Sequence, residues 1–253
     1  MQIPATDVES IERATLQAVP PEVMEALPGW LLPMDHGTVG RARSAVPLHH
    51  SEPDPGLLPA ILARYEARGF APAFRLPALS AFEAWQRELS ARGFVRQQPT
   101  LTQTCAVADL ALPVSAAHVA LDSTPDAAWM AMFLGEGLDP VDGACRARML
   151  GRATDMRYAS VRVNGITLAC GAASFGHGWL GVHGMRTAAA QRGRGLASAL
   201  LGAMAREATR RGIGRVFLQV DASNAPALSL YRRLGFTTAW PYAYWRRAQP
   251  QTP

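Results

Sequence analysis

A short glycine-rich segment at residues 191–197 restricts the folds open to this chain more than any other feature. It reads Gln-Arg-Gly-Arg-Gly-Leu-Ala and lies between an extended stretch at residues 180–187 and a stretch with helical apolar spacing at residues 196–211. Glycine lets the backbone adopt positive φ and approach a ligand closely, and the first amides of a helix are unpaired at the positive end of its dipole. This strand–loop–helix step therefore predicts an α/β fold with an anion-binding site, to which Arg192 and Arg194 can add charged hydrogen bonds.

Two common phosphate-binding motifs do not fit this loop. No Gly-Lys-Ser/Thr follows it, and the chain has no lysine, because all 25 of its basic residues are arginine. A dinucleotide fingerprint is excluded as well, since the strand before the loop is expected to belong to an antiparallel meander and not to a βαβ unit. A tight strand-to-helix connection with no ligand is the plain alternative.

The elements expected around the loop indicate a mixed α/β architecture. The pair Asn164-Gly165 is a strong signal for a two-residue hairpin turn, and Gly212 and Gly235 are placed to end helices. In chain order we expect helices at 125–134 and 140–150, strands at 158–163, 166–174 and 180–187, the helix at 196–211, a strand at 215–220, a helix at 226–234 and a strand at 236–245.

The first part of the chain alternates between helices and strands in a similar way. A Pro- and Ala-rich stretch at 112–117 is the best boundary, which divides the chain into units 1–112 and 118–253. In the first unit we expect a helix at 8–18, a Pro-rich turn up to Pro28, a strand–turn–strand at 30–47 with its turn at Asp35-His36-Gly37, a helix at 57–68, a strand at 71–76, a helix at 81–91 and a strand at 94–107.

The two units resemble each other in a way that suggests an internal repeat. Arg68-Gly69-Phe70 aligns with Arg211-Gly212-Ile213, and Arg92-Gly93-Phe94 aligns with Leu234-Gly235-Phe236 at nearly the same offset. Each unit then reads helix–Gly–strand–helix–Gly-Phe–strand, and a chance likeness between common motifs is the alternative. The first unit has no glycine loop, because the corresponding residues 49–54 are acidic and contain no glycine.

Three blocks of the second unit resemble the GNAT superfamily of N-acetyltransferases. Residues 192–197 fit the family's Arg/Gln-x-x-Gly-x-Gly/Ala pyrophosphate loop, residues 184–187 fit the strand before it, and residues 218–236 fit the strand, Asn, Tyr-bearing helix and Gly-Phe turn after it. The resemblance covers residues 157–245 well and residues 125–151 loosely. It implies a mixed, mostly antiparallel sheet flanked by helices, with two GNAT-like modules in tandem, of which the N-terminal one is degenerate.

The resemblance also implies roles for individual residues, with acetyl-CoA as the cosubstrate. Tyr231 would be the general acid that protonates the leaving sulfur, and a core aromatic packed with Leu228 and Leu234 is the alternative. Asn224 would cap the last helix and lie beside the cofactor, although capping alone would also explain it. The backbone of Met185 and Thr187 would hold the pantetheine arm, and the pyrophosphate would be held by the amides of Arg192, Gly193, Arg194, Gly195, Leu196 and Ala197.

The general base is left open by the sequence. In the GNAT branch that acetylates the N-termini of ribosomal proteins, a glutamate serves as base where this chain has Gln219, and Trp179 lies about where another branch has its glutamate. An amide cannot accept the proton. The candidates that remain are Asp221, Glu136 and His183, or a water molecule.

These features together predict an N-acyltransferase that moves an acetyl group from acetyl-CoA to a primary amine of an unidentified acceptor. The alternative is a catalytically idle module that binds acyl-CoA or a protein partner. No run of about 18 apolar residues and no signal peptide is visible, so we expect a cytoplasmic protein without a membrane contact, either a monomer or a homodimer. We expect no nucleic-acid partner, because the arginines are scattered, and no metal, because Cys105, Cys145 and Cys170 form no CxxC pair.

Overall fold

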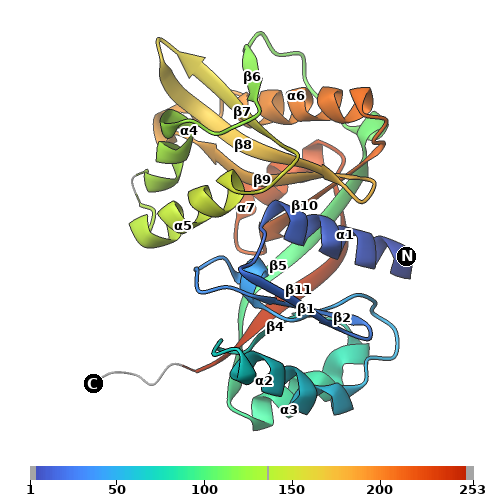
Figure 1. Ribbon diagram of the computed structural model, residues 1–253. Coiled ribbons are helices and arrows are strands. Elements are labelled where there is room, and N and C mark those ends of the chain that lie inside the picture. Colours follow the sequence, from blue (N-terminus) through green and yellow to red (C-terminus); the bar gives the residue numbers. More distant parts are fainter. Residues whose placement is uncertain (1–3, 136, 249–253) are drawn as a thin grey trace.

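One eight-stranded sheet extends through the computed structural model, which describes residues 4–135 and 137–248 (Figure 1). The strand order is β4-β11-β5-β10-β9-β8-β7-β6, and the neighbouring pairs are antiparallel except β9 and β10, which are parallel. This confirms the predicted mixed, mostly antiparallel sheet. Its strands are β4 (Ala73–Pro77), β5 (Phe94–Ala106), β6 (Val119–Asp122), β7 (Met156–Val163), β8 (Ile166–Gly176), β9 (Trp179–Thr187), β10 (Arg215–Asp221) and β11 (Thr237–Arg247).

Helices flank this sheet along its whole length. At the upper end in Figure 1 lie α4 (Ala127–Ala131), α5 (Pro140–Gly151) and α6 (Leu196–Arg210), with α7 (Ala225–Arg233) below them. At the lower end lie α2 (Leu58–Ala67) and α3 (Glu83–Ala91), and α1 (Ala5–Ala18) lies between the two ends. A smaller sheet of β1 (Val23–Leu27), β2 (Trp30–Met34) and β3 (Val46–Pro47) joins β4 through one parallel bridge between Ala45 and Phe74.

The two faces of the sheet have separate apolar cores. Side chains alternate between faces along a strand, so Val216 and Leu218 of β10 pack in one core with Leu200 of α6. Phe217 packs on the other face with Ile11 of α1. A residue of β10 that follows this alternation, such as Gln219, therefore points toward the face that α1 covers.

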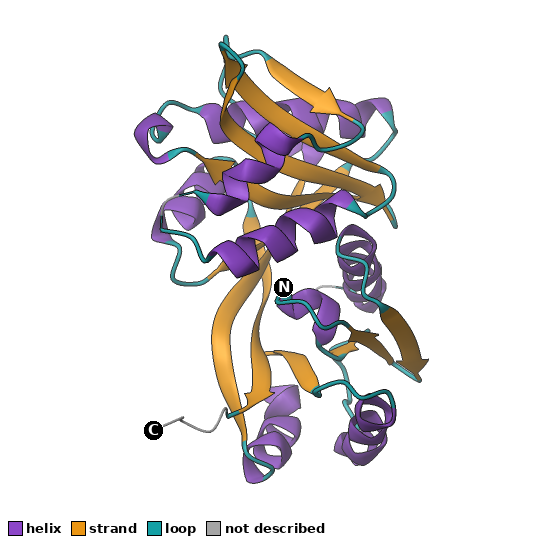
Figure 2. Cartoon of the chain, turned by 60° about the vertical axis from the view of Figure 1, so that its left-hand side comes forward, coloured by secondary structure: helices purple, strands orange, loops and turns teal. Residues whose placement is uncertain are grey.

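The predicted element order occurs twice, but the two units do not form separate sheets. The order helix–Gly–strand–helix–Gly–strand appears as α2-β4-α3-β5 and again as α6-β10-α7-β11, with positive φ at the glycines that end the helices, Gly69, Gly93, Gly212 and Gly235. The last strand of each unit pairs with the other unit: β5 lies between β10 and β11, and β11 lies between β4 and β5. Figure 1 shows β5 and β11 side by side, and Figure 2 shows this long pair connecting the two ends of the molecule.

The structure differs from the sequence-based expectation in three segments. Strand β1 lies where a Pro-rich turn was expected, and the turn is confined to Pro28 and Gly29, with φ of 76° at Gly29. Strand β6 was not expected at all. Strands β2 and β3 pair at only two positions, so the connection between them is longer than the expected turn. This connection contains a 3₁₀ turn, η1 (Gly40–Arg43).

Cys105, Cys145 and Cys170 are free thiols, and no cluster of three or more metal-ligating side chains occurs within the described ranges. Among the described helices, none is both long and apolar enough to cross a membrane.

Candidate active site

The parallel strands β9 and β10 separate in the middle of the sheet. They pair only where Leu180–Val182 faces Val216–Leu218, although β9 continues to Thr187 and β10 to Asp221. At the separation β9 contains a bulge, with φ of 58° at Gly184 and a register shift against β8 between Cys170 and Ala172. The backbone of β9 beyond Val182 is thus free on its β10 side to bind an extended ligand as an added strand.

A matching glycine lies opposite this bulge on β8. A Cβ atom at Gly171 would lie 2.4 Å from Sδ of Met185 and 3.0 Å from Cε of Met204. The close approach of Met185 to the β8 backbone therefore depends on the absence of a side chain at Gly171. The predicted contacts at Met185 and Thr187 lie on this bulged segment.

The glycine loop leads directly from the end of β9 into α6. Gly193 and Gly195 have φ of 78° and 74°, and Gly195 is the left-handed N-cap of α6. In the described part of the chain, the amides of residues 193–198 donate to no backbone or side-chain acceptor, and no side chain caps the helix. A Cβ atom at either glycine would meet no protein atom within 4 Å, so the space beside these amides is open. The arrangement fits an anion, as unpaired amides at a helix N-terminus do in general.

Helix α7 carries the predicted general acid on its last turn. Asn224 caps the helix, since its Oδ1 accepts a hydrogen bond from the amide of Ala227 at 3.2 Å. Tyr231 is 8% exposed, its ring meets that of Phe236 edge-on at 5.6 Å, and its hydroxyl has no partner among the described residues. Burial raises the pKa of Tyr231 to about 12, and the positive charge of Arg186 opposes this rise. Tyr231 is therefore protonated at neutral pH, as a general acid must be. Its ring also packs with Leu234 in the core, so the residue fits the alternative role of a core aromatic as well.

The base candidates differ in their surroundings. The Oδ1 atom of Asp221 accepts hydrogen bonds from the amide and hydroxyl of Ser223, at 2.8 and 2.6 Å, within a turn. His183 is buried with Nε2 3.0 Å from Oγ of Ser174, and burial, aided by the charge of Arg41, lowers its pKa to about 3. An imidazole with such a pKa is a weak base at neutral pH. Glu136 lies outside the described residues.

Gln219 and Trp179, at the positions where the GNAT resemblance implies a glutamate, are both engaged in other contacts. The Oε1 atom of Gln219 accepts a hydrogen bond from Nη1 of Arg41 at 3.2 Å. The indole of Trp179 is buried and donates to Oγ of Ser10 on α1 at 2.8 Å. Neither position therefore supplies a carboxylate to the site.

Sequence reasoning missed a group of half-buried arginines on this side of the site. They come from both units of the chain, so neither spacing nor a motif brings them together, and no signal distinguishes them among 25 scattered arginines. We refer to this group as the arginine cluster, which consists of Arg41, Arg43, Arg146, Arg186 and Arg246.

Solved structures share this fold over nearly the whole chain. A GCN5-related N-acetyltransferase from Kribbella flavida superposes with a TM-score of 0.68 at 18% identity, covering 98% of this chain and 97% of the other. A tandem GNAT protein from the clavulanic acid biosynthesis pathway superposes with a TM-score of 0.57 at 14% identity, covering 98% of each chain. By fold, the chain is thus GNAT-like, as the sequence resemblance implied.

Sequence comparison narrows this class to one family. The family model described as "Probable histone acetyltransferase Rv0428c C-terminal" matches residues 5–245, and the chain belongs to that family. A mycothiol acetyltransferase from Clavibacter michiganensis subsp. michiganensis is 51% identical over 55 residues, which are 22% of this chain and 18% of that protein. The chain spans about a fifth of the length of the curated relatives it matches.

Proposed function

We propose that the chain transfers an acetyl group from acetyl-CoA to a primary amine by direct attack of the amine on the thioester. The observation that carries this proposal is the row of unpaired amides at residues 193–198, which lies beside the open separation of β9 and β10. An anion site and a free strand edge next to each other suit a ligand that has a diphosphate and an extended amide-containing arm.

Each predicted contact has a counterpart in this geometry. The amides from Gly193 to Ala197 would bind the diphosphate, and the exposed guanidiniums of Arg192 and Arg194 would add charge. The amide of Arg192, which the sequence also predicted as a contact, donates instead to the carbonyl of Ala189 at 3.3 Å. The backbone of Met185 and Thr187 would bind the arm as an added strand. Asn224 would keep α7 in position as its cap. We propose that Asn224 also contacts the cosubstrate directly.

Acetyl-CoA would supply an acetyl group that is already activated as a thioester. Tyr231 would then donate a hydrogen bond to the sulfur as negative charge develops there. A thiol has a pKa of about 8.5, well below that of Tyr231, about 12. The hydroxyl would therefore stabilise the thiolate mainly as a hydrogen-bond donor, and Arg186 would help it to give up the proton by stabilising the phenolate.

The amine must lose a proton for attack to succeed. Among the described candidates, Asp221 is engaged in a turn and His183 is a weak base, so we favour water or deprotonation before binding. This choice fits the absence of a carboxylate at Gln219 and Trp179. Glu136, outside the described residues, stays a candidate.

The test combines titration calorimetry with acetyl-CoA and thiol release across a panel of amines. Gly195→Asp should abolish acetyl-CoA binding, because its side chain occupies the space beside the amides and repels the diphosphate. Gly195→Asn is the matched control, since asparagine tolerates positive φ and is similar in size but neutral. It should bind more weakly than the native protein and at least about tenfold more tightly than Gly195→Asp. Unchanged affinity in Gly195→Asp would contradict the proposal.

The second candidate is an idle module that binds acyl-CoA or a protein partner without catalysis. The observation that favours it is the amide at Gln219, held by Arg41, in place of a carboxylate. This candidate predicts acetyl-CoA binding without thiol release for every amine in the panel, whereas the proposed enzyme releases CoA with at least one of them.

A further inference from the structure

The arginine cluster gathers positive charge from four elements and both units of the chain. Arg41 and Arg43 lie on η1, Arg146 on α5, Arg186 on β9 and Arg246 on β11. Within the described residues only Arg146 forms an ion pair, with Asp142 at 2.5 Å. Half-buried guanidiniums usually have an anionic partner. Among the described groups, Asp142 and Glu12 are the carboxylates that act on the cluster, and Glu12 is already paired with Arg75, so five guanidiniums share little negative charge.

Close contacts bring the members of the cluster together. A Cβ atom at Gly40 would lie 2.7 Å from Nη2 of Arg246 and 2.7 Å from the ring of Tyr244, so η1 is packed directly against β11. The guanidinium of Arg246 lies over the Tyr244 ring, 4.7 Å from its centre. Arg41, next to Gly40, reaches Gln219 on β10. The segment η1 therefore brings the guanidinium of Arg41 to β10 and lies beside Arg246 of β11, on the sheet face that α1 covers.

The charges of the cluster also act on one another. Burial lowers the pKa of Arg186, and the positive charge of Arg146 lowers it further. Burial also lowers the pKa values of Arg41 and Arg246, and nearby arginines, Arg146 among them, add to this effect. Arg146 thus lies within electrostatic reach of three other members. The phenol of Tyr231 in turn raises the pKa of Arg186, which shows that the cluster borders the predicted acid.

Several polar atoms around the cluster are buried and have no partner in the described part of the molecule. Leaving such a group unsatisfied is costly, and here the atoms belong to the cluster and to two residues that Arg41 contacts or acts on, Gln219 and His183. They are Nε of Arg43, Arg186 and Arg246, Nε2 of Gln219 and Nδ1 of His183, which is itself 3% exposed. Most of these are donors, which an oxyanion would satisfy.

We propose that the amine acceptor also carries a compact anionic group, a carboxylate or a phosphate, and that Arg41 and Arg246 bind it. This inference rests on the proposed acetyl transfer, since it identifies the class of acceptor for that site. The phosphates of acetyl-CoA have their own anion site at the start of α6, with Arg192 and Arg194, so they do not account for the cluster. A lysine-rich acceptor is disfavoured, because its charges would face unpaired guanidiniums.

The first test compares amines that differ only in this charge. The acids are β-alanine and γ-aminobutyrate, their neutral partners are the corresponding amides, and 3-aminopropylphosphonate represents the phosphate arm. We expect kcat/KM for thiol release to be about 10–100-fold higher for a charged amine than for its neutral partner. The carboxylate raises the pKa of the amine, so intrinsic reactivity works against the expected preference.

The second test substitutes the two arginines in the full chain. In Arg41→Gln and Arg246→Gln, the ratio of kcat/KM for acid over amide should fall toward one, mainly through a higher KM for the acid. Calorimetry should find the affinity for acetyl-CoA within about twofold of the native value, because the α6 loop is a separate site. Arg96→Gln, which removes an exposed arginine of β5 that has no ion pair among the described residues, is the control and should keep the preference.

Equilibrium binding of the same acids and amides separates this inference from the proposed function. Stronger binding of the charged members, weakened in Arg41→Gln, supports an anion site even if no amine releases CoA, in which case the proposed acetyl transfer alone has failed. Equal binding of acids and amides, or binding of none of them, overturns the inference. So does a preference for the acids that Arg41→Gln and Arg246→Gln leave intact.

Discussion

The proposed role of Tyr231 depends on a single atom, its hydroxyl oxygen. Tyr231→Phe keeps the ring and its packing on Phe236 and removes only this proton donor. We expect normal folding and acetyl-CoA affinity with a loss in kcat of about 10²–10⁴-fold, the usual range for a general acid. Turnover kinetics with saturating acetyl-CoA measure this loss. It should shrink for a thioester with a better leaving group, because that sulfur needs less stabilisation.

The opposite result would identify Tyr231 as a core aromatic. Turnover at the native rate in Tyr231→Phe shows that the hydroxyl is not used. A fall in acetyl-CoA affinity or thermal stability as large as the fall in kcat would point to packing instead of acid catalysis.

His183 makes a prediction about stability at low pH. Its pKa is about 3 in the folded chain, whereas the ordinary value for a histidine is 6.5. Between these values the unfolded chain binds a proton that the folded chain does not, so stability falls as pH decreases through this window. Because pH 4.5 lies two units below the ordinary pKa of 6.5, the stability lost at this pH is about 2–3 kcal/mol.

Urea unfolding at pH 7 and pH 4.5 measures this contribution. The native chain should lose more stability between the two pH values than His183→Gln, by about 2 kcal/mol. His50, whose pKa burial lowers to about 4, contributes to the same window in both proteins and cancels in the comparison. His118→Gln, at an exposed position, should lose as much as the native chain. An equal loss in His183→Gln would show that His183 does not stay neutral in the fold.

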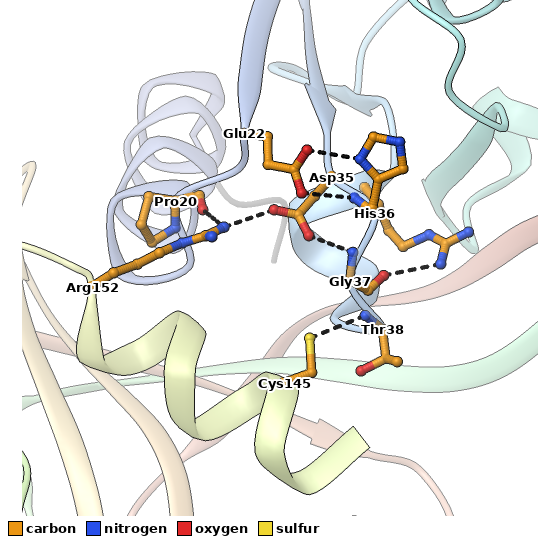
Figure 3. A network of polar contacts seen from close by, with 9 residues as sticks. Pro20, Glu22, Asp35, His36, Gly37, Thr38, Cys145 and Arg152 are labelled. Atoms are coloured by element: carbon orange, nitrogen blue, oxygen red, sulfur yellow. Dashed lines mark hydrogen bonds and ion pairs between the residues drawn. The ribbon is translucent and has the colours of Figure 1, made fainter. Parts of the chain in front are cut away.

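At the scale of elements, the connection between β2 and β3 is held against α5 by a polar network (Figure 3). Asp35, which is 6% exposed, accepts from the amide of Gly37 at 2.7 Å and pairs with Arg152 at 2.7 Å. The amide of Thr38 donates to Sγ of Cys145 at 3.2 Å, and its hydroxyl donates to Asp142 at 2.6 Å. This network anchors the segment whose continuation, η1, carries Arg41 and Arg43.

Loosening this network should weaken binding of the acceptor more than binding of the cosubstrate. Asp35→Ala removes both contacts of the carboxylate, so η1 loses part of its support and the KM for an anionic amine should rise about tenfold. The affinity for acetyl-CoA should stay the same. Glu22→Gln is the control, because Glu22 is exposed and contacts only His36 in this network. A fall in acetyl-CoA affinity in parallel with the rise in acceptor KM would indicate general destabilisation.

Local signals predicted those elements whose chemistry lies within a few residues. The Asn164-Gly165 turn has the expected positive φ of 51° and 78°. Strand β1 was missed because prolines lie on both sides of it and its residues are at most half-buried, so it resembles a turn region. The loop at Gly193 and Gly195 was predicted because glycines and a helix start are adjacent in sequence.

Contacts between distant segments could not be predicted in this way. Arg41 meets Gln219 only because η1 is anchored to α5 and packed against β11, which depends on the whole fold. The pairing of β5 with β10 is another such contact, since an extended stretch carries no information about which strand it joins. The candidate cosubstrate site was therefore visible in the sequence, whereas the proposed acceptor site was not.

At the scale of the whole molecule, the exchanged strands make the two units depend on each other. A fragment of residues 118–253 would lack β5, which leaves an open edge on β10, and β11 would lose its partners β4 and β5. A fragment of residues 1–112 would lack β11 between β4 and β5. Unpaired strands with buried side chains such as Trp240 and Tyr242 promote aggregation. Although we propose 1–112 and 118–253 as the two modules, we do not expect either to fold alone.

The connection between the modules should nevertheless tolerate a break. Residues 113–116 are exposed and belong to no helix or strand, and Val114 is fully exposed. A protease site inserted there and cleaved in the folded protein should leave acetyl-CoA affinity and a single cooperative thermal transition nearly unchanged, because the sheet pairings, not the linker, hold the units together. Separately expressed fragments should show no cooperative transition and no acetyl-CoA binding until they are refolded together. If residues 118–253 alone unfold cooperatively and bind acetyl-CoA with the native affinity, β5 is dispensable and the units are independent domains.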